Sequence, residues 1–281
     1  MEKSFFDATL DRCNKRVYRL GLSATYRPGR HTVYKAIDQG INFLFCYGFD
    51  THMTGVLRDV LRQDRERYVV ATGAYNLVWG HPNLRRTLEK RLRQLGTDYI
   101  DVFLFLGVLS GKQFDARDRE ELYRLREEKK VRSVGISCHD RKFAGELAGQ
   151  GALDVLMMRY NAAHRGAEKD IFPALDGRRT GVISYTATRW GTLLRRPAGW
   201  PPEAPVPTAG LCYRFVLTNP HVDVCLTAPR NMQELEENLA AVREGPLSGE
   251  QLKSMEDFGD AVYRATKKSR WRQPIPFDAA R

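Results

Sequence analysis

Four side chains that can move a proton follow predicted strands of this chain. Tyr47 and Asp50 come after the second strand, and His139 and His164 come after the fifth and sixth. Tyrosine, carboxylate and imidazole groups are common general acids and bases. Because the carboxyl ends of parallel barrel strands share one face, the pattern predicts a proton-transfer site with Tyr47, Asp50 and His139 as catalytic candidates. The competing interpretation of a lone loop histidine is a solvated or capping side chain.

Several other chemistries have no motif here. The sequence contains no H-E-x-x-H, no P-loop and no G-x-S-x-G, and no Cys/His cluster with the spacing of metal ligands. Its five cysteines form no C-x-x-C pair, which indicates reduced thiols rather than a disulfide framework or a metal site. The sequence therefore predicts no metal centre.

Short apolar runs alternate with helical patterns about eight times, which predicts a single (β/α)8 barrel. Most of the runs are continuous in apolar residues, as in parallel strands that are buried on both faces. The alternative is an open doubly wound sheet, which predicts a G-x-G-x-x-G after the first strand, and none is present. The predicted strands are Val17–Thr25, Ile41–Cys46, Tyr68–Tyr75, Ile100–Gly107, Val131–Cys138, Leu153–Tyr160, Gly181–Thr188 and Val222–Ala228.

One domain is expected over residues 1–281, with its core at about 17–265 and a basic tail at 266–281. The proline-rich segment 197–207 predicts an irregular loop after the seventh strand. Ser248 and Gln251 have the spacing of a capping box for a final helix. Trp271 among the cations of the tail is compatible with stacking on single-stranded nucleic acid, although a solvated tail is the preferred interpretation.

The net charge of +11 allows a nucleic acid, a phosphorylated cofactor or an anionic substrate as partner, or simply a cationic surface. The first residues lack the apolar core of a secretory signal, and the longest strongly apolar run is too short for a membrane helix. A cytoplasmic protein without membrane association is therefore expected. The sequence does not predict its oligomeric state.

Four stretches together resemble the aldo-keto reductase family over roughly residues 17–262. They occur in family order at barrel spacing: RLGLSAT followed by GINF; LEKRLRQLGTDYIDVFLFL; KVRSVGIS; and GVISYT with PRNMQELEENL. The resemblance implies a TIM barrel that binds NADP(H) at its mouth and reduces a small carbonyl substrate. In such enzymes a tyrosine beside a lysine donates the proton and a histidine orients the carbonyl.

The resemblance carries over to cofactor-binding positions at the ends of three strands and at the start of the last barrel helix. Tyr185 matches the aromatic ring that stacks on the nicotinamide, and Ser137 matches a contact to its carboxamide. Arg230 and Asn231 match the group that holds the 2′-phosphate. Glu237 and Asn238 match the pair that reads the adenine. The remaining cofactor-binding candidates are Cys138 and Thr186.

The resemblance fails at the four catalytic positions. The aspartate, tyrosine, lysine and histidine positions hold, in that order, Phe45, Asp50, Gly73 and Leu106. Tyr47 is then the preferred acid, although a phenol without a cationic neighbour is a slow proton donor. On the cofactor side, Met157 replaces a glutamine and Cys138 replaces an asparagine, while Glu234 would repel a phosphate that it faced.

Two functions follow from these observations. The first is an NADP-dependent oxidoreductase with a divergent active site and weakened acid catalysis. The second is a non-catalytic barrel, a pseudoenzyme that binds a small molecule or a protein partner. Binding of NADPH together with slow aldehyde reduction would distinguish the first function from the second. A nucleic-acid-binding protein is a third and weaker interpretation.

Overall fold

The computed structural model describes residues 4–75, 82–177 and 179–268. Within these residues, eight parallel strands close into one barrel in which β10 pairs with both β9 and β3. This confirms the predicted barrel and excludes the open sheet. The strands are β3 (Leu20–Ser23), β4 (Phe43–Phe45), β5 (Val69–Tyr75), β6 (Ile100–Val108), β7 (Val131–Cys138), β8 (Val155–Arg159), β9 (Gly181–Tyr185) and β10 (Val224–Thr227).

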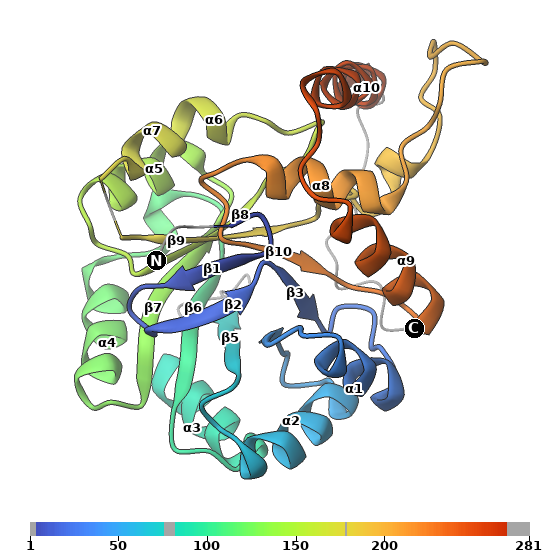
Figure 1. The fold of residues 1–281 in the computed structure, drawn as a ribbon. Coiled ribbons are helices and arrows are strands. Elements are labelled where there is room, and N and C mark those ends of the chain that lie inside the picture. The colour runs from blue at the N-terminus through green and yellow to red at the C-terminus, as the bar shows by residue number, and fades with distance from the viewer. Residues whose placement is uncertain (1–3, 76–81, 178, 269–281) are drawn as a thin grey trace.

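Helices surround the barrel (Figure 1). The predicted capping box is present, since Ser248 N–H donates to Gln251 Oε1 at 3.0 Å and Gln251 N–H donates to Ser248 Oγ at 3.2 Å. It begins the last helix, α10. The helices are α1 (Arg30–Asp38), α2 (Thr51–Gln63), α3 (Leu84–Leu95), α4 (Ala116–Glu127), α5 (Arg141–Gly149), α6 (Ala167–Asp170), α7 (Phe172–Leu175), α8 (Ala209–Thr218), α9 (Met232–Arg243) and α10 (Gly249–Lys268), with 3-10 turns at Gly111–Gln113 and Thr192–Leu194.

The strands carry two apolar layers because successive side chains point to opposite faces. In β8, Val155 and Met157 belong to the cluster inside the barrel, whereas Leu156 and Met158 pack against the helices. β4, β5 and β10 follow the same alternation, and so does the middle of β6. Side chains on the inward rows therefore reach the mouth of the barrel at the carboxyl end of each strand.

A hairpin that the sequence did not predict crosses the barrel end opposite the mouth (Figure 1). It consists of β1 (Asp7–Leu10) and β2 (Lys15–Tyr18), paired antiparallel, and its apolar side chains join the inner cluster. The predicted first strand, Val17–Thr25, is therefore wrong at its start: Val17 belongs to the hairpin. Arg19 breaks the run, because its buried guanidinium donates to backbone carbonyls, among them that of Val222 at 2.6 Å.

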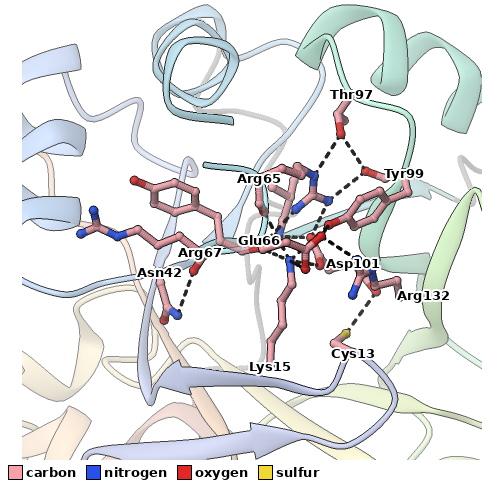
Figure 2. A network of polar contacts seen from close by, with 12 residues as sticks. Cys13, Lys15, Asn42, Arg65, Glu66, Arg67, Thr97, Tyr99, Asp101 and Arg132 are labelled. Atoms are coloured by element: carbon pink, nitrogen blue, oxygen red, sulfur yellow. Dashed lines mark hydrogen bonds and ion pairs between the residues drawn. The ribbon is translucent and has the colours of Figure 1, made fainter. Parts of the chain in front are cut away.

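A buried ionic network fastens this hairpin to the barrel (Figure 2). Lys15 Nζ of β2 lies 3.0 Å from Asp101 Oδ1 of β6, and Arg65 Nη2 lies 2.7 Å from Asp101 Oδ2. The same Oδ2 accepts the Val70 N–H at 2.9 Å. Asp101 is fully buried, so its charge depends on these partners. In the hairpin turn, burial raises the pKa of Cys13 to about 12, which keeps the thiol protonated.

Segment 197–207 contains neither helix nor strand, as its prolines predicted. The predicted basic tail begins within α10, and from residue 269, including Trp271, it lies outside the described residues. In the described part of the chain, no helix is both long and apolar enough to cross a bilayer.

Candidate functional site

Three tyrosines cover the apolar interior of the barrel at its mouth. Tyr47 follows β4, while Tyr75 and Tyr185 end β5 and β9, and all three pack on the inner cluster. The rings of Tyr47 and Tyr75 are stacked with their centres 6.2 Å apart. Burial raises the pKa of Tyr75 above its ordinary value. The sequence analysis identified Tyr47 and Tyr185 but missed Tyr75.

Tyr185 connects two strand ends. Its hydroxyl lies 3.3 Å from His139 Nε2, and the Ser137 side chain at the end of β7 acts to lower its pKa. Burial raises the pKa of Tyr185, and the charge of Arg159 acts in the opposite direction. The pKa of His139 is lowered, first by burial and then by Arg159, so its imidazole is neutral at neutral pH. The structure thus brings together Ser137, His139 and Tyr185.

Arg159 is a rim residue that the sequence analysis did not select. It continues the inward row of Val155 and Met157, and it pairs in register with Tyr185. Burial lowers its pKa, and the Tyr185 phenol counteracts that effect. The signal was available in the sequence, because an alternating row that ends in a cation at the carboxyl end of a barrel strand faces the mouth.

Asp50 serves as a helix cap. Its Oδ1 accepts the backbone N–H groups of His52 and Met53 at 2.8 and 3.3 Å, at the start of α2. The carboxylate is 2% exposed. A capping aspartate stabilises the helix N-terminus by hydrogen bonding. The described contacts of Asp50 therefore support a structural role for a residue that the sequence analysis had placed among the catalytic candidates.

Apolar packing fills three of the four catalytic positions of the family. Phe45 is fully buried inside the barrel. A Cβ atom on Gly73 would lie 2.2 Å from the Leu104 carbonyl oxygen and 2.8 Å from Leu106 Cγ. The side chain at the histidine position therefore occupies space that a side chain at the lysine position would need. The two departures are spatially coupled.

The remaining cofactor candidates on the strand ends differ in orientation. Cys138 packs in the outer layer and its thiol donates to the Asp140 carbonyl at 3.2 Å, so it faces away from the mouth. Met157 lies inside the barrel below Arg159. Thr186 has a left-handed backbone with φ +59°, and its carbonyl accepts the Asn161 side-chain amide at 2.9 Å. Strained residues of this kind concentrate at functional sites.

The start of α9 carries the candidates for the phosphate and adenine end. Asn231 caps the helix, accepting the Glu234 N–H at 2.9 Å. The guanidinium of Arg230 lies over the Tyr26 ring at 5.2 Å, while the backbone N–H of Arg230 donates to the Glu234 carboxylate at 2.8 Å. Glu237 is exposed and accepts from Gln233, and Asn238 is buried and donates to Thr227.

His164 lies beside the mouth. Its Nδ1 is 3.3 Å from Asn161 Oδ1, and its ring meets Tyr263 of α10 edge to face, with centres 5.9 Å apart. Burial, followed by the charges of Arg159, Arg189 and Arg141, lowers its pKa to about 3. The imidazole is therefore neutral at physiological pH. A neutral imidazole held by hydrogen bonding and packing supports the structural interpretation of His164.

Exposed apolar side chains mark the same end of the barrel. Among the described residues, three of the five large exposed hydrophobic side chains lie in loops that follow barrel strands: Phe49 after β4, Leu109 after β6 and Leu194 after β9. Phe49 also stacks on Tyr47, with ring centres 5.2 Å apart. Apolar groups that remain exposed around polar ones are characteristic of ligand sites.

No protein-family model matches the chain. Among curated proteins, the L-galactose dehydrogenase of Arabidopsis thaliana is 24% identical over 280 residues, which cover 87% of this chain and 86% of that protein. An aldo-keto reductase of Bacillus halodurans superposes with a TM-score of 0.73 at 19% identity, covering 90% of this chain and 95% of its own.

A third similar protein is an aldo/keto reductase of Klebsiella pneumoniae whose structure holds NADP and acetate. Its TM-score is 0.69 at 22% identity, and the match covers 88% of this chain and 93% of that one. At such identities the structural matches establish the fold. They agree with the four sequence motifs, and the chain therefore has the (β/α)8 barrel fold of the aldo-keto reductases.

Proposed function

We propose that this chain is an oxidoreductase that binds NADP(H) at the barrel mouth and reduces a carbonyl substrate, with weakened acid catalysis. The observation that carries the proposal is the partly buried ring of Tyr185 at the rim, with the Ser137 side chain acting on its hydroxyl. A hydroxyl beside a partly buried aromatic ring suits a nicotinamide, which needs both a stacking face and a partner for its carboxamide.

At the start of α9, one side chain is suited to bind the 2′-phosphate of the cofactor. Arg230 presents an exposed guanidinium at the start of α9, where a phosphate also benefits from the helix dipole. Glu234 already takes one backbone donor there, which leaves the side chain of Arg230 as the main partner for a 2′-phosphate. The Klebsiella protein was solved with NADP, which supports this choice of cofactor.

The residues of this chain would then orient the substrate and supply a proton. NADPH, when bound, supplies the hydride. Tyr47 is the proposed acid, because it lies at the mouth on the inner cluster, with its ring stacked on that of Tyr75. Gly73 stands at the lysine position, so the pairing that activates the tyrosine in this family is missing.

Cofactor titration combined with turnover tests the proposal. NADPH fluorescence should change saturably on binding, and Tyr185→Leu should weaken binding by about tenfold through loss of stacking and of the hydroxyl contact. The exposed Tyr263→Leu serves as a matched control and should bind as the wild type does. Saturable binding with no turnover of any aldehyde would favour the non-catalytic barrel instead.

A further inference from the structure

The exposed side of α3 is formed by cations alone. Every exposed residue of this helix is basic, namely Arg86, Lys90 and Arg93. Their spacing of four and three residues places them on one face of the helix. Neighbours in this row repel each other, since like charges at such a spacing destabilise an isolated helix. The row therefore does not serve the stability of α3 itself.

The acid of α3 is paired on the side of α4. Glu89 is the only carboxylate of the helix, and its Oε1 lies 3.6 Å from Lys130 Nζ, in the segment that follows α4. On the same side, Arg85 Nε lies 2.9 Å from Glu121 Oε1 of α4. The carboxylate that could have neutralised the exposed row is therefore engaged elsewhere.

Helix α2 extends this cationic surface. It lies beside α3 (Figure 1), and Arg58 Nη2 donates to the backbone carbonyl of Gln94, near the end of α3, at 2.6 Å. Arg62 lies about one turn further along α2, and both arginines are exposed. Asp59, the only acid of α2, pairs with Arg30 of α1 at 2.8 Å. The cations of the two helices form what we call the α2–α3 basic face: Arg58, Arg62, Arg86, Lys90 and Arg93.

Two further acids lie only at one end of this face. Asp64 follows the last residue of α2, and Asp98 follows the end of α3. Asp64 Oδ1 accepts the backbone N–H of Arg67 at 3.1 Å, so this carboxylate closes a turn. Along the two helices, the acids pair with neighbouring elements while the basic face stays positive.

The chemistry of the basic face fits the backbone of double-stranded DNA. From Arg86 to Arg93 the helix rises about 10 Å. Duplex DNA carries one charge per about 1.7 Å of its axis, so about six phosphates lie along that length. Four of the five cations are arginines, whose guanidinium groups bind phosphate through paired hydrogen bonds.

A bilayer and a single strand fit this face less well. Both are usually bound with the help of apolar or aromatic side chains, which enter the membrane or stack on the bases. Among the described residues, none of the large exposed hydrophobic side chains belongs to α2 or α3. The backbone of a duplex needs only the positive charge.

We propose that the α2–α3 basic face binds the phosphate backbone of double-stranded DNA without reading its sequence. Contacts to phosphate carry no sequence information, which suits a face that offers cations only. The sequence analysis ranked a nucleic acid third among the interpretations, and the cations gathered on two packed helices favour it. The inference is independent of the proposed function, because the basic face lies on the outer helices and the cofactor site at the barrel mouth.

Fluorescence anisotropy with a labelled 20-base-pair duplex of random sequence tests the proposal between 50 and 200 mM KCl. The logarithm of the wild-type binding constant should fall against the logarithm of the salt concentration with a slope of about −4, close to −0.9 for each of the five cations. The triple variant Arg86→Gln, Lys90→Gln and Arg93→Gln should flatten the slope by about three and weaken binding at 50 mM KCl by at least about tenfold. Glutamine retains a high helix propensity, so α3 should persist.

A matched variant removes three exposed cations from α4 and the residues after it, where acids such as Glu120 are interleaved: Arg117→Gln, Arg124→Gln and Lys129→Gln. It should keep the wild-type slope. Arg86→Lys combined with Arg93→Lys should keep it too, because the charge is retained.

Four results decide the matter. Both triple variants should titrate NADPH as the wild-type protein does, which separates the basic face from the cofactor site. No binding of the duplex by the wild-type protein at 50 mM KCl overturns the inference, and so do equal slopes for the two triple variants. Loss of binding to phosphatidylserine vesicles in the α3 variant, with DNA binding unchanged, would assign the face to a membrane instead.

Discussion

At the level of single residues, apolar packing occupies the positions that the resemblance aligns with the catalytic side chains of the aldo-keto reductases. Leu106 lies where a side chain on Gly73 would have to pass, and Phe45 fills the interior beside them. A side chain introduced at position 73 would therefore overlap atoms of Leu104 and Leu106. Glycine is required at position 73 by the close approach of the Leu104 carbonyl.

Gly73→Ala should lower the free energy of unfolding by about 1–3 kcal/mol, because the new methyl group overlaps backbone and side-chain atoms. Urea denaturation measures the effect. Gly249→Ala is the control, since nothing lies within 4 Å of its Cβ position, and it should not lower the midpoint. An unchanged midpoint for Gly73→Ala would show that β5 and β6 lie further apart than described.

Tyr47→Phe should lower residual aldehyde reduction by about tenfold or more, given that general acid catalysis is typically worth about 10²–10⁴ in rate. His139→Ala should lower it less, because its imidazole contacts Tyr185 rather than the Tyr47–Tyr75 pair. Steady-state kinetics with NADPH and benzaldehyde measure both variants. If Tyr47→Phe reduces the aldehyde at the wild-type rate, the proton comes from another group.

His164 makes stability depend on pH. Its native pKa of about 3 lies below the unfolded value of 6.5, so only the unfolded chain takes up the proton as the pH falls below that value. Denaturation should therefore show a loss of up to about 1 kcal/mol between about pH 7.5 and about pH 5.5. The His164→Gln variant should lose less over the same interval. Identical pH profiles would mean that His164 is solvated and titrates normally.

The sequence predicted part of the candidate site. It indicated Tyr47, Ser137, Tyr185 and Arg230 from strand ends and family motifs, whereas Asp50 proved to cap a helix. Arg159 was missed, although the alternation along β8 contains the signal. Which hydroxyl meets which imidazole depends on the tilt and register of neighbouring strands, and no local pattern encodes that.

At the level of elements, continuous apolar runs identified all eight barrel strands. They failed at the hairpin, because Val17 and Leu20 belong to one apolar run but to different sheets. The break follows from Arg19 and from pairing with the short strand β1, whose residues carry no strong strand pattern. Contacts distant in sequence, such as Lys15 with Asp101, decide where the first barrel strand begins.

Lys15→Met should destabilise the protein by about 3 kcal/mol, because it leaves the buried Asp101 with less compensating charge. Arg65 remains as a partner of Asp101, so the loss of stability should lie at the lower end of the range of about 3–5 kcal/mol that is typical when one partner of a buried ion pair is removed. Arg16→Met is the control on the same hairpin, since it removes an exposed pair with Asp7 and should cost less than about 1 kcal/mol. Equal effects would mean that the Lys15 pair is effectively solvated.

At the level of the whole molecule, the chain has the barrel fold of the aldo-keto reductases, and the proposed function gives this barrel a weakened acid. The fold gathers strand ends at one mouth, so binding and orientation can persist after the proton donors are replaced. Reduction of simple aldehydes should therefore be at least about 100-fold slower than in an aldo-keto reductase with all four catalytic residues. This factor is the lower end of the rate enhancement of about 10²–10⁴ that general acid catalysis typically provides. Full-speed reduction of benzaldehyde would reveal an acid outside the Tyr47–Tyr75 pair.

The central claim is that the mouth holds a nicotinamide dinucleotide phosphate. The most direct test is fluorescence titration of the wild-type protein and of Arg230→Ala with NADPH and NADH. The wild-type protein should bind NADPH more tightly than NADH by about tenfold or more, the value of one guanidinium–phosphate contact, and Arg230→Ala should remove most of that difference. Absence of saturable binding of either dinucleotide by the wild-type protein would contradict the account.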